Sequence, residues 1–231
     1  MMRSASIICR SGSIRFLFVI VWLLPAFAGC SSKPPAAPSA PSSSITTPSG
    51  YQLPHNISFS EHWFATPAVD LMSAEGTYIR AYIEGDHVAS NNVDRADGSY
   101  PGFATAAHDR SFNWLGTGLP SKGFFTNWVH ELTLAPDGSA VAVVCYAGAV
   151  DVEFPNDYGI FKRTITFQRA GAAPPADQKG TARAPLVSVF GNWYTSNFET
   201  GPFMDPDCAT NPPPVDKSPV PTPGWPDHPA M

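Results

Sequence analysis

An apolar run near the amino end, residues 16–30, constrains the fold more than any other stretch, because it decides which part of the chain folds. Arg3, Arg10 and Arg15 precede this run, and small residues close it. The layout predicts a secretory signal peptide over residues 1–29. The run is shorter than the roughly 20 apolar residues that a membrane-spanning helix needs, and Pro25 interrupts its end. We therefore expect the folded part to be exported and to form without residues 1–29.

A cysteine directly follows this segment. Ala28-Gly29-Cys30 resembles the lipobox of bacterial lipoproteins, in which the chain is cut before the cysteine and the cysteine is acylated. The resemblance implies a lipid on Cys30 that holds the protein in the cell envelope, with its domain on the exported side. Phe27 stands where lipoboxes usually carry Leu, and Ala26-Phe27-Ala28 also fits ordinary signal peptidase. Release as a soluble protein beginning at Gly29, or retention by an uncleaved anchor, are the alternatives.

The cysteine count links export to the fold. Cys9 leaves with the predicted signal, so the exported chain keeps Cys30, Cys145 and Cys208. Exported proteins form lasting disulfides, and three thiols cannot all pair. If Cys30 carries lipid, Cys145 and Cys208 are the natural pair. The alternative is that Cys145 is a buried thiol and Cys208 a free one.

Composition sets the domain boundaries and excludes one class of partner. Three of the 14 basic residues precede Cys30, so 11 basic residues face 19 acidic ones after it, a formal net charge of −8. This balance argues against nucleic-acid binding. A Pro/Ser/Ala-rich stretch over residues 30–50 predicts a disordered tether behind the lipidated cysteine, and residues 205–231 predict a proline-rich tail. The residues between them, 51–204, suit a single domain.

The pattern within this domain predicts an α+β fold. Thr66 and Pro67 favour the start of an amphipathic helix that ends near Gly85, with Ile79 and Ile83 on its apolar stripe. Thr77, Arg80 and Glu84 are expected on its solvent face. Strands are predicted over 128–135, 140–147, 161–169 and 184–198, with a turn at 136–138 and 140–147 as the central strand. We expect the helix to pack on a curved antiparallel sheet.

Part of this domain resembles the NTF2-like cone-shaped domains of exported bacterial proteins. The resemblance lies in residues 75–86, in the hairpin around Pro136-Asp137-Gly138, and in Gly191-Asn192-Trp193-Tyr194-Thr195. It implies a cone cavity, in which some members of the family transfer a proton with an Asp or a His. No motif of their active sites is recognisable here.

The sequence carries no nucleophile or metal signature, so an enzyme is the less favoured interpretation. The weak catalytic candidates are His108, Asp109, Asp86 and His130, and no cofactor or metal is expected. We predict a lipid-anchored lipoprotein with a non-catalytic domain that binds a protein partner or a small apolar ligand. The alternatives are an NTF2-like enzyme with a cavity Asp or His, and a structural or surface protein without a pocket.

Overall fold

The structure is a computed structural model that describes residues 50–92, 99–108, 120–149 and 159–228. These residues belong to one compact unit, residues 47–231. The predicted signal peptide, Cys30 and nearly all of the predicted tether lie outside the described residues, as does Asp109. Within the described part of the chain, no helix is both long and apolar enough to cross a membrane.

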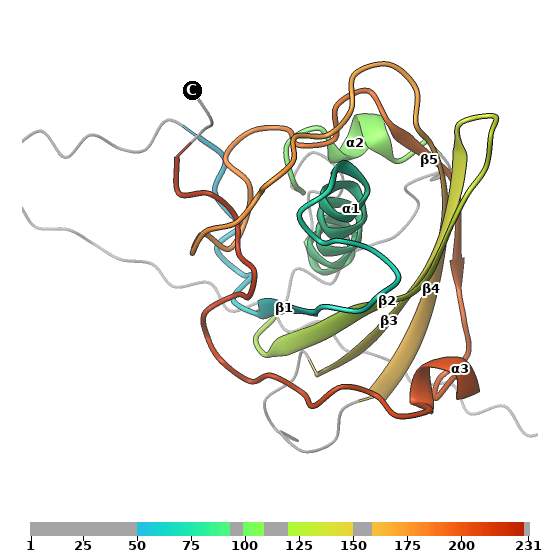
Figure 1. Cartoon of the computed structure of the whole chain (residues 1–231). Helices are drawn as coiled ribbons and strands as arrows, with labels where there is room; N and C mark the ends of the chain where they lie inside the picture. The colour runs from blue at the N-terminus through green and yellow to red at the C-terminus, as the bar shows by residue number, and fades with distance from the viewer. Residues whose placement is uncertain (1–49, 93–98, 109–119, 150–158, 229–231) are drawn as a thin grey trace, which may run out of the picture. The chain divides into compact units, whose positions relative to one another are not determined.

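A five-stranded sheet forms one layer of the domain (Figure 1). Its strands are adjacent in chain order: β1 Ser60–Phe64, β2 Phe124–Leu134, β3 Ser139–Ala149, β4 Gly159–Gln168 and β5 Tyr194–Thr200. The α+β class is confirmed, but the expectation of a purely antiparallel sheet is wrong, because β1 pairs with β2 in parallel. The sequence hid this strand, since polar residues occupy both faces of SEHWF and no apolar alternation is visible.

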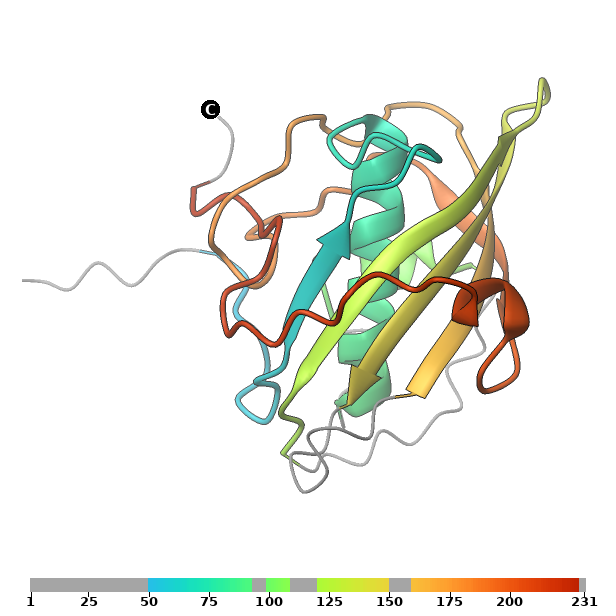
Figure 2. The same cartoon turned by 60° about the horizontal axis from the view of Figure 1, so that its bottom comes forward.

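The helix α1, Ala74–Asn91, covers one face of the sheet, which we call the inner face (Figures 1 and 2). It lies in the chain between β1 and β2, where a parallel pair requires a crossover. The helix begins seven residues later than predicted, because Ser73 caps it by accepting a hydrogen bond from the Gly76 amide. Thr66 instead donates to the Val129 carbonyl. The helix also continues past Gly85.

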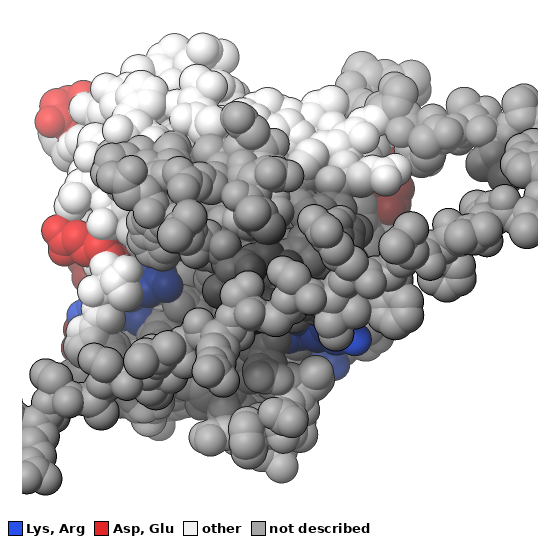
Figure 3. All heavy atoms as spheres, turned by 180° about the vertical axis from the view of Figure 1, so that it is seen from behind, with Lys and Arg blue, Asp and Glu red and all other residues white. Residues whose placement is uncertain are grey.

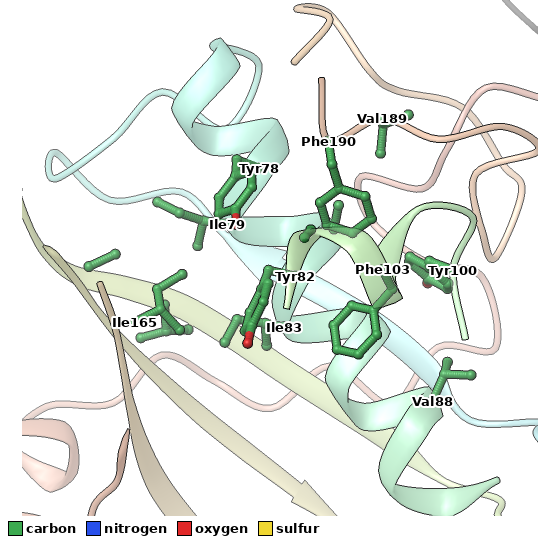
Figure 4. Close-up of a cluster of buried hydrophobic side chains, with 14 of the residues drawn as sticks. Tyr78, Ile79, Tyr82, Ile83, Val88, Tyr100, Phe103, Ile165, Val189 and Phe190 are labelled. Atoms are coloured by element: carbon green, nitrogen blue, oxygen red, sulfur yellow. The ribbon is translucent and has the colours of Figure 1, made fainter. Parts of the chain in front are cut away.

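The helix is buried on all sides rather than amphipathic. Every residue from 76 to 89 is buried, including the predicted solvent-facing residues Thr77, Arg80 and Glu84. One side packs on the sheet, and other sides meet the short helix α2, Phe103–Ala106, and the loop before β5 (Figure 4). This core includes Tyr78, Ile79, Tyr82, Ile83, Phe103, Ile165 and Phe190.

The three strands from β2 to β4 match the sequence expectation closely. The turn at 136–138 joins β2 to β3, with Gly138 at φ 87° and the Asp137 carboxylate accepting from the Ser139 amide. As predicted, β3 is central, with β2 and β4 on either side. β5 starts ten residues later than predicted. Gly191, at φ 59°, lies in a turn before the strand.

The proline-rich segment after Thr200 packs on the domain, so the fold does not end at residue 204. The helix α3, Pro206–Ala209, carries Cys208, which is bonded to Cys145 of β3 as predicted, with Cα atoms 5.5 Å apart. The chain then crosses the outer face of the sheet (Figure 2) and reaches the edge of β1, where the Trp63 amide donates to the Thr222 carbonyl. Trp225, 1% exposed, enters the core. Prolines prevented a prediction of helix or strand here, but they do not prevent packing.

Candidate functional site

The inner face holds a buried carboxylate that ties three distant segments to α1. Glu84 Oε1 accepts from Trp63 Nε1 at 2.8 Å, and Oε2 accepts from Tyr100 Oη at 2.8 Å and Trp225 Nε1 at 2.6 Å. Burial raises the pKa of Glu84 to about 7, although the charge of Arg80 opposes this shift. Because all three donors are structural side chains, this carboxylate anchors the fold rather than a ligand.

A second buried carboxylate lies near the other end of α1. Glu61 Oε1 lies 2.8 Å from His87 Nδ1, and Asn127 Nδ2 donates to Glu61 Oε2 at 2.8 Å. Burial raises the pKa of Glu61 well above its usual range, and the hydrogen bond from Asn127 opposes this shift. The imidazole of His87 stacks on Phe125, with ring centroids 4.1 Å apart. The pair has the contacts of an acid–base dyad, but both side chains are at least nine-tenths buried.

The structure does not bring the predicted catalytic candidates together. His108 is exposed and stacks on Tyr194. Asp86 is buried on α1, where its charge contributes to raising the pKa of Tyr146. His130 is exposed at a register shift in β2. These three residues therefore lie in three different surroundings. Asp109 lies outside the residues that the structure describes.

The outer face of the sheet carries a groove that the sequence did not reveal. A hollow of about 800 Å³ lies between β2, the loop after β1 and the C-terminal segment, and its lining includes Phe64, Pro67, Trp128, Leu132 and Pro213. A neighbouring hollow of about 430 Å³ also includes Phe64, with His62, Thr126 and residues 214–217. We call these two hollows together the outer groove. Phe64, which lines both, is 49% exposed.

One wall of the outer groove is held by a contact between β1 and the C-terminal segment. His62 Nε2 lies 2.9 Å from the Ser218 carbonyl oxygen and 3.1 Å from Ser60 Oγ. His62 Nδ1 lies 3.4 Å from Asp216 Oδ2. A serine contacts a histidine that in turn contacts an aspartate, as in the catalytic triad of a serine hydrolase. Sequence reasoning missed it because Asp216 is more than 150 positions from the other two residues, and Ser-x-His spacing alone has no specificity.

Its hydrogen bonds are nevertheless wrong for nucleophilic catalysis. The hydroxyl of Ser60 donates to the Ser218 carbonyl at 2.7 Å. Because that carbonyl oxygen can only accept, His62 Nε2 also carries a proton toward it, and so cannot take one from Ser60. The three residues therefore fasten the C-terminal segment to β1.

Two further properties of the described surface are its capacity to hold a metal ion and its distribution of charge. In the described part of the chain, no three His, Cys, Asp or Glu side chains are placed to hold a metal ion. On the face in Figure 3, described acidic and basic side chains are interspersed, without a surface of one sign among them. The chain matches no protein-family model, no curated protein and no solved structure. The outer groove is therefore argued from its own chemistry.

Proposed function

We propose that this protein is an envelope lipoprotein, anchored by lipid at Cys30, whose domain binds an extended segment of a partner protein in the outer groove. The observation that carries the proposal is the exposure of Phe64 between two hollows, next to Pro67, Trp128 and Pro213. An exposed aromatic within a proline-walled groove that combines apolar and polar side chains is typical of protein recognition surfaces. The proposed role is binding and needs no catalytic group in the groove.

A protein segment suits this groove better than a small molecule. Small-molecule sites are concave and enclose most of their ligand. Here the two hollows lie side by side along the outside of β1 and β2 and share Phe64, so an elongated ligand contacts both. The rigid proline walls lower the entropy lost on binding, since they are ordered before the partner arrives.

Lipid attachment complements this arrangement. Residues 31–49 separate Cys30 from the first described residue. An extended proline-rich chain rises about 3.1 Å per residue, so this tether would allow the groove to work up to about 60 Å from the bilayer. A partner in the envelope would be reached without movement of the anchor.

The NTF2-like enzyme is the second candidate function. The observation in its favour is the contact between Glu61 and His87, since a carboxylate that orients an imidazole is a common base arrangement in proton transfer. Its weakness is access, because His87 is packed against Phe125 and Tyr146. We therefore place partner binding first.

Photo-crosslinking in intact cells tests the groove. A benzoylphenylalanine at position 64 and another at Asn211, on the opposite wall, should each capture the same protein, giving adducts of the same added mass. The matched control is Leu134, which is equally exposed at 49% but lies at the hairpin end of β2, outside both hollows. Adducts of equal yield from Leu134, or different adducts from the two walls, would refute the groove as the binding site.

A further inference from the structure

Arg163 is a charged residue on the apolar inner face of the sheet. It lies on the same face of β4 as Ile165 and Phe167, which pack in the main core under α1. Its guanidinium lies between two aromatic rings, with Cζ 5.1 Å from the centroid of Tyr146 and 5.6 Å from that of Phe198. Cation–π contacts of this kind hold the group in place, and one of its N–H donors also bonds Tyr146.

Two of those donors lack an acceptor among the described residues. Nε and Nη1 of Arg163 are buried, and no described protein atom accepts a hydrogen bond from either. An unsatisfied buried N–H destabilises a fold, so a purely structural arginine would be expected to have found carbonyl partners. Arg80 differs, because both of its terminal nitrogens donate to carbonyls, those of Gln178, Pro223 and Gly224, and only its Nε lacks an acceptor among the described residues.

An aromatic surface leads from Arg163 to the outside. Tyr146 stacks on Phe161 with centroids 5.1 Å apart, and Phe161 meets Phe203 edge-on at 5.5 Å. Phe203 is 66% exposed, the highest value among the exposed large hydrophobic residues of the described chain. Phe161, Arg163 and Phe198 are only partly buried. We call the set Tyr146, Phe161, Arg163, Phe198 and Phe203 the Arg163 shelf.

The charges around the shelf select the ligand. Burial raises the pKa of Tyr146 to about 12, with the charges of Asp86 and Glu61 adding to the shift and that of Arg163 opposing it. The phenol is therefore neutral at physiological pH and can donate a hydrogen bond. One cation, one neutral donor and two acidic neighbours suit an anion with a single charge better than a phosphate dianion. Arginine binds carboxylates through paired N–H groups.

We propose that the Arg163 shelf binds an organic monocarboxylate, with the carboxylate on Arg163 and an apolar or aromatic body on Phe161 and Phe203. This site lies on the opposite face of the sheet from the outer groove, and its ligand is independent of the proposed partner protein.

The test uses the full chain in lipid nanodiscs, with empty nanodiscs as the blank. The probe is 4-(trifluoromethyl)benzoate, followed by fluorine NMR, and its matched probes are the corresponding benzyl alcohol and benzylamine. We expect the benzoate to bind at least tenfold more tightly than either matched probe. In Arg163→Met this preference should disappear, whereas Lys122→Met, at a lysine before β2 that the shelf does not include, should keep it.

Thermal melting separates ligand binding from a structural role. Arg163→Met removes two unsatisfied donors and keeps the stem, so its melting temperature without probe should not fall below that of the wild type. Arg163→Lys keeps the charge but not the paired donors, and should retain a weakened preference for the benzoate. Equal binding of all three probes by the wild type, or a benzoate preference that survives in Arg163→Met, would overturn the proposal.

Discussion

Replacement of Glu84 by Gln tests whether one buried carboxylate controls the pH dependence of stability. The carboxylate offers acceptors on both oxygens, to Trp63 on one and to Tyr100 and Trp225 on the other. Glutamine has one acceptor oxygen and one donor nitrogen, so in either orientation an indole N–H faces an NH₂ group. Leaving that buried N–H without an acceptor costs about 1–3 kcal/mol.

The buried carboxyl of Glu84 destabilises the folded protein when it ionises at higher pH, whereas glutamine does not ionise. Its pKa rises from the ordinary glutamate value of 4.5 to about 7 in the folded protein. Between these values the folded state binds more protons than the unfolded state, so stability is greatest below pH 4.5 and is lost as pH rises through 7. From pH 5 to pH 8 this group alone lowers the free energy of unfolding by about 2–3 kcal/mol.

The informative quantity is the difference in unfolding free energy between wild type and Glu84→Gln. The titrations of groups that do not interact with Glu84 cancel in this difference. At pH 5 the variant should be less stable by the cost of the lost acceptor. By pH 8 the gap should narrow by about 2–3 kcal/mol, because the variant has no charge to bury. Urea unfolding at each pH, followed by tryptophan fluorescence, measures this difference.

The control is Glu131→Gln, at an exposed glutamate on β2, which should follow the wild type at every pH. Unfolding free energies of wild type and Glu84→Gln that run parallel from pH 5 to pH 8 would show that burial does not perturb Glu84, and the reasoning would fail.

Three further predictions concern the ends of the chain. Replacing both Cys145 and Cys208 by Ser should lower the unfolding free energy by about 4 kcal/mol on the chain-entropy model, given a sequence separation of 63; an unchanged urea midpoint would contradict this. Trp225→Ala should cost about 3–5 kcal/mol, whereas Val220→Ala, at a half-exposed position, should melt like the wild type; equal melting temperatures would show that the C-terminal segment does not stabilise the core. Cys30→Ser should abolish labelling by a fatty-acid analogue and free the protein from the membrane with an unchanged melting temperature, and retained label would place the lipid elsewhere.

Some elements of this fold were readable from the chain alone because short-range chemistry decides them. The turn at 136–138 needs only an Asp that accepts from the Ser139 amide and a Gly that tolerates positive φ. The apolar character of both faces identified β3 as central. In β4 the alternation was visible too, and it contained the signal of the shelf, since Arg163 interrupts an apolar face.

Helix α1 shows where local information stops. Thr66 and Ser73 both have N-cap chemistry, and the choice between them depends on Val129, which binds the hydroxyl of Thr66 from another strand. The spacing of Arg80 and Glu84 marks a polar face, and in an isolated helix that face would be solvated. In the protein it is covered, because Trp225 stacks on Arg80 and donates to Glu84.

The sequence by itself determined the α+β class and the central strand with its hairpin, and it predicted the pairing of Cys145 with Cys208 that the structure contains. Only the tertiary structure decided the parallel strand β1, the packed C-terminal segment, the outer groove and the Arg163 shelf. The physical reason is separation along the chain: turns and strand alternation depend on neighbours within a few residues. Grooves and buried charges depend instead on segments such as Ser60–Phe64 and residues 213–225, which meet only when the chain has folded.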